Sequence, residues 1–232
     1  MTWLLWKEYR QNRLIVLFLA LLMVVPSVAI AVIHVTEDAK DRLWTSPEEA
    51  VAMAVFYALA FSQVVLALIG GLAIAGERAD RSAEFQAYLP IPRWKIFTAK
   101  LFLALYLAAI IWLPTGVLFC ILRWEPRFAL SNPCESLRSM FAGLPYIAIT
   151  GLTFFCVGWL FSSLTSSPTL AVFAGLLTPL VLSIGIGVGS EVVGLARMSD
   201  ELIKFSFLAI YPSLSPICFL LGSWLFLRRV EP

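Results

Sequence analysis

Six long runs of apolar residues dominate this chain and constrain its fold more than any other feature. Each run is about 20 residues or longer, which is the length that a helix needs to cross the hydrocarbon core of a bilayer. Backbone polar groups find no water in lipid, so the runs are predicted to be helices. The predicted spans are residues 14–35, 51–75, 101–122, 141–164, 169–188 and 205–227.

Composition agrees with a membrane protein and excludes an ordinary soluble domain. Of 232 residues, 60% are hydrophobic and only 14% are charged. We therefore expect an all-α integral membrane protein in which residues 1–232 form a single transmembrane domain. Pro212 and Pro216 lie inside the last apolar run, so this span is expected to be kinked and to begin before residue 205.

The distribution of basic residues predicts the orientation. An even number of spans puts both termini on one side, and ten of the 17 Lys and Arg residues fall on that side, close to the ends of the spans. Because basic residues favour the cytoplasmic side, both termini and residues 76–100 are predicted to lie in the cytoplasm. The expected location is a plasma membrane of bacterial inner-membrane type, crossed several times.

Aromatic and basic residues precede the first span. Their spacing is nearly helical, which is typical of a helix that lies in the membrane interface over residues 1–13. An ordinary aromatic and basic anchor for the first span would use the same residues. The predicted anchor residues are Trp3, Trp6, Lys7 and Arg10.

Residues for catalysis or metal binding are sparse. The four cysteines have no metal-site spacing, the single histidine is His34, and the sequence contains neither a G-x-S-x-G elbow nor a G-x-x-x-x-G-K-[ST] nucleotide loop. We predict no catalytic, cofactor-binding or metal-binding residue, and no nucleic-acid partner. The chain is not expected to be an enzyme by itself.

The predicted spans carry no charged residue near their centres. Ion-coupled carriers usually place ionisable groups there, so a gradient-driven mechanism is poorly supported. If ATP supplies the energy, a separate chain must bind it. Small residues at helical spacing predict close helix packing, with packing inside the chain favoured over a dimer face. These residues are Ala50, Ala54 and Ala58, then Ala171 and Gly175, then Gly185 and Gly189.

Residues 76–100 form a charged segment between the second and third spans. Its first half is predicted to be a short polar helix with an apolar side formed by Phe85 and Tyr88. Pro90 ends that helix, and Pro92 allows the next one to begin. The alternative is a solvated loop held at the membrane surface by basic residues such as Arg93.

The same segment resembles a known family, the permeases or membrane subunits of type-2 ABC transporters, in the exporter-like group. The resemblance also includes Trp6 to Arg10 before the first span. Two positions depart from the family pattern: Arg81-Ser82 stands where Gly-Thr is usual, and Pro92 replaces a small hydroxyl residue. The matching motifs are Gly76-Glu77-Arg78, Glu84-Phe85, Leu89-Pro90-Ile91-Pro92-Arg93 and Ile96 to Lys100.

This resemblance implies a six-helix permease that exports an unidentified substrate. It would pair with a second permease, identical or similar, within the membrane lipid, and with cytoplasmic ATPase subunits that bind ATP. Residues 76–100 would contain the coupling helix. For residues 189–204 a plain extracellular loop is the default expectation, and the resemblance adds a re-entrant hairpin as the alternative. The implied coupling residues are Glu77, Arg78, Arg81, Glu84, Phe85, Tyr88, Pro90, Pro92 and Arg93.

Two other classes of protein stay open on the residues alone. A channel or carrier would have to use Gln63, the hydroxyl side chains and the glycines near residue 187. A membrane assembly or anchoring subunit requires no special residue at all.

Overall fold

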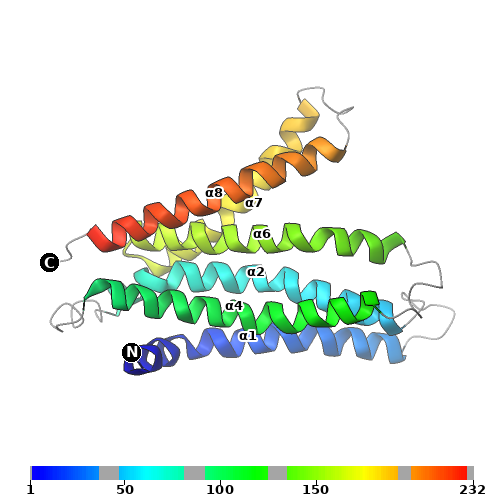
Figure 1. The fold of residues 1–232 in the computed structure, drawn as a ribbon, viewed down its shortest axis with the longest axis horizontal. Helices are drawn as coiled ribbons and strands as arrows, with labels where there is room; N and C mark the ends of the chain where they lie inside the picture. Colours follow the sequence, from blue (N-terminus) through cyan, green and yellow to red (C-terminus); the bar gives the residue numbers. More distant parts are fainter. Residues whose placement is uncertain (1, 37–46, 81–91, 125–134, 193–199, 229–232) are drawn as a thin grey trace.

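The computed structural model describes residues 2–36, 47–80, 92–124, 135–192 and 200–228, and these residues form long helices without a strand (Figure 1). The helices run side by side as an elongated bundle. In chain order they are α1 (Thr2–Thr36), α2 (Pro47–Ala79), α4 (Arg93–Trp124), α6 (Glu135–Leu164), α7 (Pro168–Val192) and α8 (Asp200–Arg228).

Each predicted span falls within one of these helices, and the helices extend beyond the apolar runs. Within the described part of the chain, four stretches are long and apolar enough to cross a membrane: Ala54–Ala79, Tyr146–Leu164, Pro168–Gly185 and Ala209–Arg228. The count of six spans and the cytoplasmic placement of both termini stay predictions.

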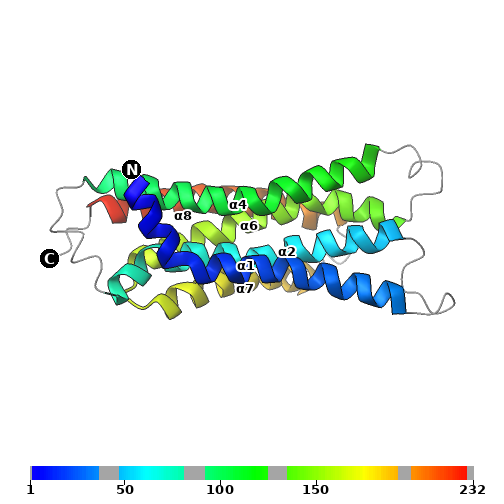
Figure 2. The ribbon, with the colours of Figure 1, turned by 90° about the horizontal axis from the view of Figure 1, so that it is seen from below.

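One boundary differs from the prediction and another agrees with it. The interfacial helix predicted before residue 14 is continuous with the first span, because α1 runs unbroken from Thr2 to Thr36, with a bend near its N-terminal end (Figure 2). Helix α8 begins at Asp200 and includes both prolines, as the length of the apolar run required. The segment 189–204, with its alternatives of a plain loop and a re-entrant hairpin, lies partly outside the described residues.

Helices α2, α6 and α7 approach one another closely through glycines. A Cβ atom added to Gly158 of α6 would lie 2.9 Å from the backbone nitrogen of Gly71 in α2. One added to Gly175 of α7 would lie 2.9 Å from the Cα of Gly158, and one at Gly70 would overlap the carbonyl oxygen of Phe155. Since a real Cβ rarely comes so close to backbone, these positions require glycine. By contrast, Gly185 faces open space.

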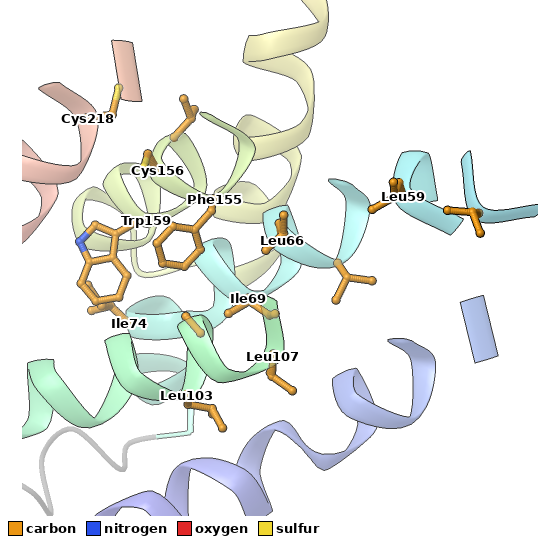
Figure 3. Packing of buried hydrophobic residues seen from close by; sticks show 14 residues of the cluster. Leu59, Leu66, Ile69, Ile74, Leu103, Leu107, Phe155, Cys156, Trp159 and Cys218 are labelled. Carbon is orange, nitrogen blue, oxygen red and sulfur yellow. The ribbon is translucent and has the colours of Figure 1, made fainter. Parts of the chain in front are cut away.

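An aromatic cluster around the fully buried Trp159 joins α4, α6 and α8 at one end of the bundle. Figure 3 shows Trp159 and Phe155 among the buried residues of the core. The Trp159 ring lies 5.7 Å from that of Phe97, 6.0 Å from those of Phe155 and Phe219, and 6.5 Å from that of Phe226. Tilted and edge-on contacts at these separations stabilise aromatic cores beyond the area they bury. This cluster is the place where α4 contacts α8.

Hydroxyl groups connect α6, α7 and α8 further along the bundle. Thr153 and Ser215 share a hydrogen bond of 2.8 Å, and the Tyr211 hydroxyl donates to the carbonyl of Pro179 at 2.8 Å. Bonds of this kind hold helices together where neither partner can bind water. Other hydroxyls of the predicted spans, such as those of Ser62, Thr150 and Ser223, donate to carbonyls of their own helix.

Candidate functional site

The C-terminal turn of α2 carries consecutive charged residues, Glu77 and Arg78, just after the apolar part of the helix. Helix α2 ends at Ala79, and the amide of the next residue, Asp80, donates to the carbonyl of Gly76 at 3.1 Å. Glu77 is only 4% exposed despite its charge. A buried carboxylate requires a cation or strong hydrogen-bond donors close by.

Two lysines provide the positive charge. Lys7 of α1 contacts Glu77 Oε1 at 2.7 Å, and Lys100 of α4 contacts Glu77 Oε2 at 3.0 Å. The Lys100 ammonium also lies 3.3 Å from each carboxylate oxygen of Glu8, in α1. We call Lys7, Glu8, Glu77 and Lys100 the ionic cluster. It joins three helices and contains two positive and two negative charges.

The ionic cluster is buried almost throughout. The side chains of Lys100, Glu8 and Glu77 are 2%, 4% and 5% exposed, and only Lys7, at 22%, reaches the surface. Burying an ion pair gains little net free energy, because the cost of desolvation offsets the attraction. Removing one partner, however, leaves an uncompensated charge in a medium of low dielectric. The ionic cluster thus fixes the relative position of its three helices more than it adds stability.

Burial and charge pairing shift the pKa values of two members. Burial raises the pKa of Glu8, which the Lys100 ammonium partly offsets and the nearby Glu77 carboxylate reinforces. For Lys100, burial alone would lower the pKa, but the carboxylates of Glu77 and Glu8 outweigh it, so its pKa is raised. Lys100 therefore keeps its charge while buried.

Arg78 points to the other side of α2, toward the turn between α6 and α7. Its Nη1 donates to the carbonyls of Ser163 and Thr165 at 3.1 Å each, and to that of Ser162 at 3.5 Å. The last carbonyls of a helix have no partner within the helix, and a cation suits the negative end of its dipole. Arg78 thus caps the C-terminus of α6.

Ser162 adds a second link between α2 and α6. Its hydroxyl oxygen accepts hydrogen bonds from the amides of Ile74 and Ala75 at 2.9 and 2.8 Å. After this turn, Ser167 caps α7, whose first residue is Pro168. Glu77 therefore ties the end of α2 to α1 and α4. Arg78 ties it to the end of α6 and to the turn that leads into α7.

The remaining residues predicted for coupling fall at or beyond the start of α4. Pro92 is exposed, and its carbonyl accepts from the Lys95 amide at 2.9 Å in the first turn, while Arg93 is half-buried. The predicted short helix and its proline elbow lie outside the described residues. So do the five candidates Arg81, Glu84, Phe85, Tyr88 and Pro90.

The predicted anchor residues do not all face outward. Trp6 is 61% exposed and its ring lies 5.9 Å from that of Tyr9, and Arg10 is exposed as well. Lys7 is different, because its ammonium belongs to the ionic cluster. Trp3 lies in α1, and its side chain is outside the description.

Two members of the ionic cluster, Glu8 and Lys100, were not among the predicted site residues. Lys100 had a detectable signal, since it stands on the buried stripe of α4 with Ile96, Ala99, Leu103 and Leu107. A lone charge on an apolar stripe predicts a buried partner. Glu8 follows Lys7 directly in a short amphipathic stretch and carried no comparable signal.

A comparison with protein families finds that the model of the ABC-2 family transporter proteins matches residues 5–178. The match includes the whole ionic cluster, Arg78 and the turn between α6 and α7. Neither the curated proteins nor the solved structures contain a match.

Proposed function

The chain belongs to the ABC-2 family of transporter proteins and is an integral membrane protein, and on that premise we propose its part in transport. We propose that it is the permease subunit of an ABC exporter, with a second permease, identical or similar, completing the translocation path. A separate ATPase subunit would bind and hydrolyse ATP, in keeping with the absence of a nucleotide loop from this sequence. The substrate is unidentified.

The segment between α2 and α4 is the part we assign to the ATPase contact. Glu77 stands in the last turn of α2, which ends at Ala79, and Lys100 stands in the second turn of α4. Both ends of the intervening segment therefore lead into the ionic cluster. The observation that carries the proposal is the pairing of Glu77 with Lys7 and Lys100, which ties both ends of the segment to α1.

The mechanism follows from this arrangement. When the ATPase subunits close, they would push on the segment, and the ionic cluster would make α1, α2 and α4 move together. Arg78 would pass the movement to α6 and α7 through the carbonyls at the end of α6. A rigid link is required for such transmission, because a flexible one would absorb the displacement.

The transmission can be tested with Glu77→Gln in the assembled, membrane-reconstituted complex. We expect the complex to form while stimulation of its ATPase activity by substrate is lost, since the amide cannot hold both lysines. Asp80→Asn is the matched control, because Asp80 is an exposed acid at the same helix end. Equal stimulation in both variants would contradict the proposed transmission.

The ATPase contact itself needs a second experiment. Replacing Phe85 and Tyr88 by alanine is expected to reduce co-purification of the ATPase and its stimulated turnover. Unchanged values for both would exclude this segment as the contact surface.

A further inference from the structure

An apolar groove of about 470 Å³ separates α4 from α6 and α8 beyond the aromatic cluster. Its size lies within the range of about 300–1,000 Å³ that is usual for ligand sites. Leu66 of α2 forms part of its wall. The other walls include Leu101 and Leu105 of α4, Leu152 of α6, and Pro216 and Phe219 of α8. We call it the α4–α8 groove.

The lining selects a hydrocarbon occupant. The hydroxyl of Ser215, one of the lining residues, is already hydrogen-bonded to Thr153 and to the carbonyl of Tyr211. The rest of the wall is made almost entirely of aliphatic and aromatic side chains. An empty groove would lose dispersion contacts along its whole wall, and a polar occupant would lose its hydration without compensation.

The dimensions favour a single chain over a helix. The lining residues of α4 run from Leu101 to Trp112, which at 1.5 Å per residue is about 17 Å. One leaflet of a hydrocarbon core about 30 Å thick measures about 15 Å. A helix about 10 Å across fills on the order of 400 Å³ per turn, so the groove could hold only about one turn of another helix. It can accommodate an extended acyl chain over the depth of a leaflet.

Positive charge lies at the end of the groove nearest the ionic cluster. Trp94 precedes Leu101 by seven residues, so it lies on the groove face of α4, and it is 55% exposed. The Lys95 ammonium lies 5.7 Å from the Trp94 ring. Lys95 has no acidic partner among the described residues.

We propose that the α4–α8 groove binds one acyl chain of an anionic phospholipid, whose headgroup contacts Trp94 and Lys95 at the start of α4. Lipid tails are as apolar as leucine, so the shape of the groove alone gives little selectivity within a bilayer. The headgroup provides it, because each basic residue near an anionic lipid contributes about 1 kcal/mol, or roughly fivefold in binding. The site requires neither an ATPase nor a cargo.

The first experiment measures lipid retained by the purified full-length chain, using native mass spectrometry after exchange into detergent with phosphatidylglycerol or phosphatidylcholine of identical chains. We expect the wild type to retain one phosphatidylglycerol in preference to phosphatidylcholine. Leu105→Trp should abolish this retention by filling the groove. Leu113→Trp is the matched control, because Leu113 is an exposed leucine on the same helix that does not line the groove, and it should retain lipid.

The headgroup contact has its own variant. Lys95→Gln is expected to lower the ratio of phosphatidylglycerol to phosphatidylcholine about fivefold. A wild type that binds both lipids equally would overturn the assignment of an anionic headgroup.

A second measurement avoids the variants altogether. Phosphatidylglycerol with a photoreactive group on its chain should label peptides that contain Leu105 and Phe219 more than the exposed face of α7. Uniform labelling, or retention unchanged by Leu105→Trp, would overturn the site. A shift from dimer to monomer in Leu105→Trp, with lipid retention intact, would assign the groove to a second copy of the chain and likewise overturn it.

Discussion

Helices α2 and α4 are neighbours in the sequence but are held in the bundle by different physical means. Helix α2 contacts α6 and α7 backbone to backbone, at glycines that leave no room for a side chain. Helix α4 packs on α1 and α2 but is separated from α6 and α8 by the α4–α8 groove, except where Phe97 enters the aromatic cluster. Buried ion pairs provide its remaining attachment.

This difference suggests a division of roles. Close-packed interfaces behave as rigid units, because any displacement meets steep repulsion. A helix beside a groove, held by a few directional contacts, can move at lower cost. In our proposal, α2, α6 and α7 therefore move as one rigid unit. Helix α4 follows α2 through the ionic cluster and can shift relative to α6 and α8.

The largest effect is expected from a substitution that forces α2 and α6 apart, which tests whether their contact is close-packed. Gly158→Val would place side-chain atoms against the backbone of Gly71 and Ala67, which cannot shift without moving a whole helix. We expect a loss of more than about 3 kcal/mol in the free energy of unfolding. The measurement is thermal unfolding in detergent, followed by the fraction that remains monodisperse. Gly185→Val serves as control, since open space surrounds Gly185; equal losses in both would refute the close packing.

Removal of the central cation tests how α4 is attached. Lys100→Met leaves the carboxylates of Glu8 and Glu77 with only Lys7, so we expect a loss of about 3–5 kcal/mol in the free energy of unfolding. Adding Glu8→Gln restores neutrality, and the double variant should be more stable than Lys100→Met alone. Denaturant unfolding in mixed micelles provides the values. Strictly additive effects would show that the two residues do not interact.

Loss of the Arg78 cap should have a smaller effect. In Arg78→Lys the charge persists, but one ammonium cannot reproduce the donor geometry toward three carbonyls, so about 2 kcal/mol should be lost. Unfolding of this variant is compared with that of Arg10→Lys, in which the arginine is exposed. Indistinguishable stabilities would rule out a role for the cap.

The smallest expected effect concerns pH. Since the folded state raises the pKa of Glu8, its stabilising contribution is present at acid pH, where this carboxyl is protonated, and is lost as the pH rises through its folded pKa. Glu8→Gln should therefore flatten the decrease in unfolding free energy that occurs as the pH rises above the ordinary glutamate pKa of about 4. The raised pKa of Lys100 predicts a further loss of stability at alkaline pH. A steeper acid-side dependence in Glu8→Gln would reverse the assigned sign.

Much of the fold followed from local pattern. An uncharged apolar run of bilayer length has few alternatives to a helix, so each predicted span corresponds to a helix of the structure. The early start of α8 was also predicted correctly, because the apolar run after Pro216 is too short to span a bilayer alone. The pattern did not predict that residues before 14 and the first span form one helix, α1. A charged helical stretch and an apolar one can join without any break in the backbone.

The candidate site was less accessible from sequence. Glu77 and Arg78 were recognised through their motif, but partners such as Lys7 and Thr165 are 70 or more residues away along the chain, and even Lys100 stands on the next helix. Such pairings depend on how the helices pack, and periodicity within one helix carries no information on that. The groove was equally hidden, because a leucine that faces a neighbour and one that faces a hollow look alike in sequence.

The ionic cluster has a consequence for how the chain enters the membrane. All four of its residues lie within the first 100 positions, whereas Trp159 and the glycines of α6 and α7 come later. The charges can thus neutralise one another as soon as the start of α4 has been synthesised, before the second half of the protein exists. Biogenesis would then proceed from a three-helix intermediate that is already electrically balanced and awaits α6 to bury its apolar side.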